Sequence, residues 1–409
     1  MGKEIREEIP KEQAVKVGDI IGHRFFFERQ NYKVDDALER YERVDLRHLD
    51  TYTIDPEGAH EHDDALSVEK HERGGELEGY TAWVHVADVP SMVPKGSFID
   101  HHAREKSRTF YYSDGTDDML PPEILERVSL EAGEIRPANT IEMRFDEDGD
   151  MQGWNIYRSV INIDFNLSYG ESVRYMSTVR ADDEMDRRLH NTDDLPWDLS
   201  EKWGDSDFYE DLSEEEKTVV GDLDDLEFLA HHLADERRDS LVNRQDPAMM
   251  TVQEFMVQAN RVAAREMTER GGGLYRAHGT PEGWDERVAS YLEQSGMDEI
   301  AEELRGAETV EEVLEEDIDM PFLFNEDAED DFRAYYSVAP RGHEGLDFEV
   351  YAPLTSPARR YPDNVNWRLI HGESDYDDSE LARIATRINS EMMPGAFTDE
   401  KAEFEALAS

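Results

Sequence analysis

The residues best suited to chemistry lie in the segment TIDPEGAHEHDDAL, residues 53–66, which holds four closely spaced carboxylates. They are Asp55, Glu61, Asp63 and Asp64. Strand-like runs flank the segment, and Pro56 and Gly58 favour a turn that folds the later carboxylates back toward Asp55. Converging carboxylates need a cation to stay ionised, and hard oxygen ligands favour Mg²⁺, with Mn²⁺ as the second possibility. The spacing therefore predicts a divalent-metal site in which two ions about 3.5–4 Å apart would clamp the attacking water and the leaving oxygen of a phosphodiester.

Two other interpretations apply to the same segment. Acidic clusters such as DDEMD, EDAEDD and DYDD occur elsewhere in the chain, and such clusters are usually solvated surface. The strand-like flanks TYTI and ALSV distinguish this segment from those tracts. His60, His62 and Asp64 also form HxHxD, which resembles the metal motif of metallo-β-lactamase-type nucleases. Ala65 stands where that motif needs a histidine, so this interpretation is the weaker one.

The charge of the chain is extreme. Of its 409 residues, 98 are acidic and 43 are basic, giving a formal net charge of −55. Such a composition can indicate disorder, but six Trp, 17 Tyr and 16 Phe favour a folded protein. Molar salt shortens the Debye length to about 3 Å and screens self-repulsion. Because only ten of the basic residues are Lys, we expect a folded protein adapted to a salt-rich cytoplasm.

Signals for export or membrane insertion are not found in the sequence. It contains no cysteine, which excludes disulfides and thiolate metal sites. The charged start, MGKEIREEIPKEQ, lacks the apolar core of a signal peptide. No apolar run approaches the roughly 20 residues that cross a bilayer. We therefore expect a cytoplasmic protein without membrane contact.

Hydrophobic patterns predict strands in the first part of the chain and helices later. Residues 81–89 and 153–163 are β-branched and aromatic runs typical of strands. Pro121 and Pro122 could open a helix between them. Helices are predicted at 222–240, 251–270, 310–318 and 379–391. The acidic, turn-rich residues 178–225 are interpreted as surface loops and short helices.

Seven motifs, in order, resemble the catalytic domain of the ribonuclease II / ribonuclease R (RNB) family. They are VDLRHLDTYTIDPEGAHEHDDAL, WVHVADVPSMVPKGSFID, TFYYSDGTDDMLPPEIL, SVINIDFNLSY, QEFMVQANRVAAREM, LYRAH and APLTSPARRYPDNVNWRL. They span roughly residues 45–372, and TSPARRYPD after HVADV is the most specific pair. The resemblance implies an α+β fold, a single large RNB-type catalytic domain with a mixed sheet flanked by helices.

The resemblance also implies roles for the carboxylates. Asp55, Asp63 and Asp64 match three of the family's four metal-site aspartates. Glu61 stands at the fourth position and reaches one methylene further. Asp63 is the aspartate that the resemblance ties most closely to cleavage.

An arginine is implied at the scissile phosphate. Arg359, in TSPARRYPD, matches the family's phosphate-facing arginine, and a guanidinium can stabilise charge that builds on phosphoryl oxygens. Arg360, its neighbour, could exchange roles with it. Without the flanking motif, a surface ion pair would be the better interpretation of two adjacent arginines in so acidic a chain.

The resemblance also implies aromatic residues that contact the RNA. Tyr111 and Tyr169 match positions that stack on or pin the last nucleotides, and Tyr112 could replace Tyr111 under a slip of one residue. Stacking of a base on a ring contributes roughly 1–3 kcal/mol whatever the sequence. Glu254 matches a position near the 3′ end of the RNA. Taken alone, each tyrosine is as easily explained as a core residue, and His85 and Asp88 of HVADV are interpreted as structural.

The predicted domain organisation leaves little room outside the catalytic domain. We expect an N-terminal extension at 1–45, the RNB domain at 46–395 with an acidic surface segment at 178–225, and a frayed tail at 396–409. We expect no counterpart of the family's β-barrel RNA-binding modules or of its second stacking aromatic.

The predicted function is hydrolysis of single-stranded RNA from the 3′ end to nucleoside 5′-monophosphates with Mg²⁺ or Mn²⁺. Two alternatives remain, an RNA-binding pseudonuclease of the same fold, for which Glu61 would be a sign of decay, and an acidic scaffold without catalysis.

Overall fold

The computed structural model describes residues 14–16, 41–112, 115–180, 212–236, 246–278, 334–343, 346, 348–373 and 376–392. The chain divides into two compact units. One comprises Met1–Gly273 and Ala352–Tyr376, and the other comprises Leu274–Tyr351 and Asp377–Ser409. The predicted domain boundaries stay a prediction, and the predicted helix at 310–318 and the tail at 396–409 lie outside the described residues.

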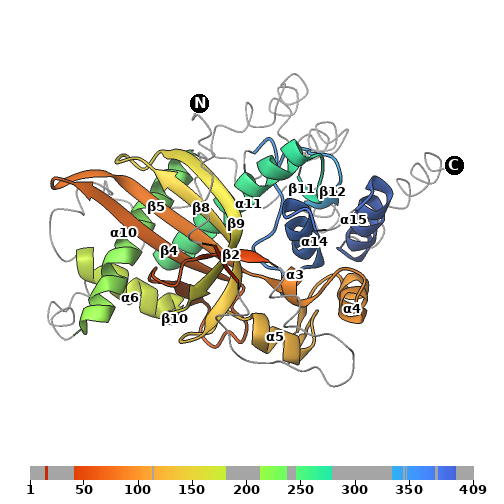
Figure 1. Cartoon of the computed structure of the whole chain (residues 1–409), viewed down its shortest axis with the longest axis horizontal. Coiled ribbons are helices and arrows are strands. Elements are labelled where there is room, and N and C mark those ends of the chain that lie inside the picture. Colours follow the sequence, from red (N-terminus) through yellow and green to blue (C-terminus); the bar gives the residue numbers. More distant parts are fainter. Residues whose placement is uncertain are drawn as a thin grey trace, which may run out of the picture. The chain divides into compact units, whose positions relative to one another are not determined.

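The first unit is built on a mixed sheet whose described strands follow the order β1-β2-β9-β8-β5-β4-β3-β10 (Figure 1). They are β1 (Ala14–Lys16), β2 (Glu42–Asp45), β3 (Tyr52–Asp55), β4 (Asp64–Arg73), β5 (Glu76–Ala87), β8 (Ile135–Phe145), β9 (Met151–Asn162) and β10 (Phe165–Ser168). Most neighbours are antiparallel, but β2 pairs with β9 and β10 pairs with β3 in parallel. The central strand β5 is buried from Tyr80 to Ala87 because its run YTAWVHVA is apolar enough to be covered on both faces.

Helices flank this sheet, which confirms the predicted fold class. The helices α6 (Tyr169–Arg180), α10 (Glu214–Glu236) and α11 (Pro247–Arg270) pack on one another and against β3, β4 and β5 (Figure 1). Four shorter helices complete the described part of this unit: α3 (Val89–Met92), α4 (Phe98–Lys106), α5 (Pro122–Val128) and α14 (Tyr361–Ile370). No described helix is long and apolar enough to cross a membrane.

Side-chain caps fix the starts of α6 and α10. Ser213 and Glu216 form a reciprocal capping box, in which Glu216 accepts from the Ser213 amide at 2.8 Å and Ser213 Oγ accepts from the Glu216 amide at 3.2 Å. The helix α10 therefore begins at Glu214, and the predicted start at 222 was wrong. The interpretation of 178–225 as surface loops and short helices was wrong from Glu214 on, because those residues belong to this long helix. An equivalent box between Ser168 and Glu171 starts α6, which was not predicted. Most of the rest of 178–225 lies outside the described residues.

Other predicted elements agree with the structure apart from their ends. Pro121 caps α5 and Pro122 is its first residue. The strand predicted at 81–89 ends at Ala87, because the side chain of Asp88 accepts from the Ser91 amide at 3.2 Å and so starts α3. The helix α11 begins at Pro247, four residues before the predicted start, after the Asp246 cap.

The second unit contains a two-stranded antiparallel sheet, β11 (Tyr275–Ala277) with β12 (Tyr335–Ser337), and α15 (Asp378–Met392). Asn389 of α15 holds β12 by both main-chain groups of Tyr336. Its side chain accepts from the Tyr336 amide at 2.7 Å and donates to the carbonyl at 2.8 Å. The helix predicted at 379–391 is confirmed to within a residue at each end.

Candidate active site

The carboxylates meet at one end of the sheet because of strand order. Asp55 ends β3 and Asp64 begins β4, the strand paired with it. Asp63, the residue before Asp64, is held by the neighbouring strand β5, because the Ala87 amide at the end of β5 donates to the Asp63 carbonyl at 2.9 Å. The parallel register of β10 with β3 sets Ser168 opposite Asp55. The turn predicted from Pro56 and Gly58 thus brings the chain from the end of β3 back to the same end of the sheet, where β4 begins.

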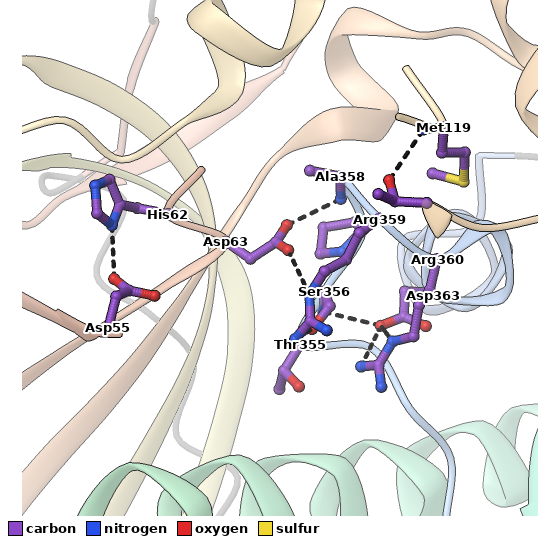
Figure 2. Close-up of polar contacts among 12 residues, drawn as sticks. Asp55, His62, Asp63, Met119, Thr355, Ser356, Ala358, Arg359, Arg360 and Asp363 are labelled. Atoms are coloured by element: carbon purple, nitrogen blue, oxygen red, sulfur yellow. Dashed lines mark hydrogen bonds and ion pairs between the residues drawn. The ribbon is translucent and has the colours of Figure 1, made fainter. Parts of the chain in front are cut away.

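Asp63 holds the segment that carries the predicted phosphate-facing arginine (Figure 2). One carboxylate oxygen accepts from the Ala358 amide at 2.9 Å and the other accepts from Arg359 Nε at 3.2 Å. Arg359 Nη2 donates to Ser356 Oγ at 2.8 Å. Asp63 is 6 % exposed while Arg359 is 43 % exposed, so a buried anion anchors a guanidinium that still faces solvent.

Arg360 is bound differently. Its Nε and Nη2 donate to one oxygen of Asp363, at 3.1 and 2.8 Å, and the same oxygen accepts from the Ser356 amide at 2.8 Å. Figure 2 shows the two arginines directed to separate aspartates. The structure thus distinguishes two residues that the sequence left exchangeable. Arg359 lies at the carboxylate cluster and Arg360 stabilises its own loop, so a substrate role for Arg360 stays a prediction.

Burial and mutual repulsion disfavour ionisation of the carboxylates. Burial, with the charges of Asp55 and Asp63, raises the pKa of Asp64 to about 8. Burial, with Asp118 and Asp63, raises the pKa of Glu61 to about 7. Burial also raises the pKa of Asp63, against the opposing effect of Arg359. The predicted four residues therefore do lie near one another.

Their side chains do not converge on a single point. Among the described residues, no three His, Asp or Glu side chains are arranged to hold an ion together. The donor set nevertheless fits Mg²⁺ or Mn²⁺ in its chemistry, since it consists of carboxylate oxygens, and a bound cation would lower the raised pKa values of Glu61 and Asp64.

His62 is a part of the site that the sequence analysis considered only within HxHxD. Its Nδ1 lies 2.6 Å from an Asp55 oxygen and 3.3 Å from Thr53 Oγ1. Burial opposes the charged imidazole, but the hydrogen bond and charge of Asp55 raise the pKa of His62. The sequence around His62 gives no local signal for this contact, because the contact depends on the turn between β3 and β4.

A cavity of about 570 Å³ lies beside this pair. It is lined by Asp55, Pro56, Glu57, Gly58, Ala59, His62, Asn166, Leu167, Ser168, Gly170, Glu171 and Arg174. Asp55 is the predicted site carboxylate that lines this cavity.

The predicted aromatic Tyr111 lies on a hairpin tied to the arginine segment. The hairpin consists of β6 (Phe110–Tyr112) and β7 (Gly115–Asp117). At its base the Thr109 amide donates to the Arg359 carbonyl at 3.0 Å. Burial raises the pKa of Tyr111. The charge of Arg359 opposes this rise and the charge of Glu61 adds to it, so charged groups of the site act on the phenol. Tyr111 is 63 % and Tyr112 60 % exposed, so neither is a core residue.

Tyr169 is the first residue of α6 and directly follows Ser168, which pairs with Asp55 in the β10–β3 register. Burial and the charges of Asp55 and Asp64 raise its pKa. Glu254 is 2 % exposed in the middle of α11, and its place near an RNA end stays a prediction.

His85 and Asp88 have structural roles, as interpreted from HVADV. The His85 ring, fully buried, lies 3.1 Å from Ser67 Oγ and 2.9 Å from Thr140 Oγ1. Asp88 is paired with the buried Arg43.

Fold and site together define the class of protein. Residues 43–373 match the model of the RNB domain, and the chain belongs to the RNB family. It is 30% identical over 390 residues to Ribonuclease R of Aquifex aeolicus, covering 89% of this chain and 52% of that protein. The chain spans about half the length of the curated relatives it matches.

Solved structures share the fold. Mycoplasma genitalium RNase R, in complex with ribose methylated single-stranded RNA, matches with a TM-score of 0.63 at 20% identity, over 94% of this chain and 59% of that chain. Yeast Ssd1, described as a pseudonuclease, matches with a TM-score of 0.58 at 17% identity, over 86% of this chain and 43% of that chain.

Proposed function

We propose that the protein hydrolyses single-stranded RNA from its 3′ end and releases nucleoside 5′-monophosphates. Family membership and the similarity to Ribonuclease R support the reaction class. The observation that carries the proposal is the exposed guanidinium of Arg359, anchored on buried Asp63 beside the other carboxylates. A fixed cation next to clustered oxygen donors suits a phosphodiester, whose charge builds on phosphoryl oxygens during cleavage.

One or two Mg²⁺ ions, or Mn²⁺ in their place, would be held by Asp55, Glu61, Asp63 and Asp64. When bound, the metal supplies positive charge to the phosphodiester and lowers the pKa of water. Asp63, the fourth member of the predicted set, already accepts two hydrogen bonds from the arginine segment.

The chain's own residues would bind and orient the RNA. Within the described part of the chain, Arg359 Nη1 has no hydrogen-bond partner, so it can donate to a phosphoryl oxygen while Nε and Nη2 stay anchored. Tyr111 and Tyr169 would stack on the terminal bases. Stacking suits an acidic protein, because counterion release contributes little to affinity at molar salt. The RNA bound to the Mycoplasma relative supports this substrate class.

A second candidate is an RNA-binding pseudonuclease. Among the described residues no three ligating side chains already surround one point, and this observation favours it. The fold is compatible with such a role, since Ssd1 is described as a pseudonuclease.

The test uses a 5′-labelled single-stranded RNA in molar KCl with Mg²⁺. The wild type should produce a ladder that shortens from the 3′ end, and chelator or Asp64→Asn should abolish it. The matched control is Asp45→Asn, which alters an exposed aspartate paired with Arg47 and should cleave like the wild type. RNA binding without cleavage, with either Mg²⁺ or Mn²⁺, would establish the pseudonuclease instead.

A further inference from the structure

The hairpin that carries Tyr111 has a second face, formed by Arg108, Phe110 and Tyr112, which the proposed function does not use. Side chains alternate along an extended strand, so Tyr111 faces one side of β6 while Phe110 and Tyr112 face the other. The side of Tyr111 is the side of the carboxylate site, where the charge of Arg359 acts on its phenol. Tyr112 is 60 % exposed on the opposite side.

The second face is open around Tyr112. The residue paired with Tyr112 across the hairpin is Gly115, and residues paired in this way share a face. Gly115 has no side chain, and a carbon added to it would meet no atom within 4 Å. The strands β6 and β7 form a sheet of two, so no third described strand covers an edge of the hairpin. The ring of Tyr112 is therefore accessible to a planar partner.

A cation lies on the same face. The guanidinium carbon of Arg108 is 5.0 Å from the centre of the Phe110 ring, and among the described residues no carboxylate is paired with Arg108. Asp117 lies opposite Phe110 in the register, and its ion pair with Lys106 neutralises this carboxylate. The run KSRTFYY, residues 106–112, holds two cations, three aromatic rings and no carboxylate, in a chain with 98 acidic and 43 basic residues.

The base of the hairpin is fixed to the arginine segment of the site. The Thr109 amide donates to the Arg359 carbonyl at 3.0 Å, and Thr109 Oγ1 accepts from the Met119 amide at 2.9 Å. Arg108 and Arg360 form an antiparallel bridge between the two segments. Both faces of the hairpin are thus held next to the segment that carries Arg359.

We propose that the second face binds nucleotides of single-stranded RNA that lie upstream of the 3′-terminal ones. Phe110 and Tyr112 would stack on bases and Arg108 would pair with a phosphate, a combination that binds single strands whatever their sequence. This inference rests on the proposed function, because it needs an RNA whose 3′ end lies at the carboxylates. A strand that leaves the site past Tyr111 reaches the other side of the hairpin next.

The test compares the affinities of two RNAs by fluorescence anisotropy in molar KCl, in the non-cleaving Asp64→Asn background. One RNA has about four nucleotides and the other about twelve, which brackets common site sizes for single strands. Tyr112→Ala should weaken binding of the longer RNA by about 5- to 100-fold, the contribution of one stacked base, and that of the shorter RNA by less than about twofold. Tyr112→Phe keeps the ring and should keep both affinities. An unchanged affinity for the longer RNA in Tyr112→Ala, or equal losses for the two RNAs, would overturn the inference.

Phe98→Ala is the matched control. Phe98 is an aromatic residue of α4 at 66 % exposure, comparable to Tyr112, and it lies outside the hairpin. Its replacement should leave both affinities unchanged. A loss equal to that of Tyr112→Ala would show that any exposed ring contributes, and the second face would then have no specific role.

Photocrosslinking locates the contact directly. A 5-iodouridine placed several nucleotides from the 3′ end of the longer RNA should crosslink to Phe110 or Tyr112, identified by mass spectrometry. The same base at the 3′ end should not crosslink to them. If the second face instead joins two copies of the chain, Tyr112→Ala should convert a dimer to a monomer in sedimentation and leave RNA affinity unchanged, which would overturn the inference.

Failure of this inference is distinguishable from failure of the proposed function. If neither RNA binds, the proposed function fails and the inference fails with it. If both RNAs bind and Tyr112→Ala binds them as well as its parent does, only the inference fails. If the wild type binds RNA without cleaving it, hydrolysis is refuted, and the two affinities still decide whether the second face contacts RNA.

Discussion

Replacing Arg43 with Met should destabilise the fold by about 3–5 kcal/mol, because it leaves a buried carboxylate without its main partner. The side chains of Arg43 and Asp88 are both 0% exposed. Arg43 also donates to the Ala138 and Ser159 carbonyls, at 3.2 and 3.3 Å, and to Ser91 Oγ at 2.8 Å. The lost guanidinium thus leaves four acceptors, one of them charged, without this donor.

The other groups that contact Asp88 limit how much stability Arg43→Met can lose. Burial would raise the pKa of Asp88, but the charges of Arg43 and Arg158 hold it well below its ordinary value. After substitution, Arg158 Nε at 3.7 Å, the Asn139 amide at 3.3 Å, the Ser91 amide at 3.2 Å and the Ser91 hydroxyl remain. Because the pKa of Asp88 is lower in the folded than in the unfolded protein, its ionisation stabilises the fold at pH values above the unfolded pKa of ~3.9. That contribution is lost as pH falls toward the folded pKa. The difference between variant and wild type should therefore be largest at neutral pH and shrink below about pH 4.

The assay is urea unfolding at a fixed molar concentration of KCl, so that screening is constant. Arg47→Met is the matched control, since Arg47 pairs with Asp45 at 37 % and 29 % exposure and should cost less than about 1 kcal/mol. Equal losses for the two variants, or a loss below about 1 kcal/mol for Arg43→Met, would refute the assignment of the buried pair.

Three further predictions concern binding and stability. Tyr169→Ala should weaken RNA affinity by about 1–3 kcal/mol, measured by fluorescence anisotropy with the non-cleaving Asp64→Asn background; unchanged affinity would remove Tyr169 from the RNA site. Burial raises the pKa of Asp222 to about 7 although Tyr52 donates to it at 2.7 Å, so ionisation of Asp222 destabilises the fold as pH rises from about 4 to 8. Asp222→Asn should therefore stabilise the fold by about 1–2 kcal/mol at pH 8 and by little at pH 4. A gain in thermal melts that does not depend on pH would contradict this. Gly79→Ala would place a methyl carbon 2.2 Å from the Phe145 carbonyl oxygen at a φ of +143°, so it should cost at least about 1–3 kcal/mol in urea unfolding, whereas a neutral effect would show that the β5–β8 edge can move.

Local pattern was enough to predict elements whose burial is set along their own sequence. The apolar run of β5 and the stripe of α11 were found for this reason. Two of their ends were missed where a cap intervened, at Asp88 and Asp246, and the start of β5 was missed because Glu76 to Glu78 are not buried. The start of α10 was missed because Glu216 looked like one more residue of an acidic tract, while its side chain in fact accepts from the Ser213 amide.

The sequence predicted which residues belong to the site, but it did not predict which of them contact one another. The motif order identified Asp63 and Arg359, but they are 296 residues apart, and nothing local shows which arginine reaches the aspartate. The same holds for His62, whose contact with Asp55 depends on the turn between two strands. The four carboxylates predicted to converge do not surround one point in the described part of the chain.

The most direct test of the proposed reaction is chromatographic detection of products from unlabelled single-stranded RNA with Mg²⁺, for the wild type and Arg359→Gln. The account predicts nucleoside 5′-monophosphates from the wild type and release at least about 100-fold slower from Arg359→Gln, with RNA binding retained. Internal oligonucleotides or 3′-monophosphates as products, or equal rates for the two proteins, would contradict it.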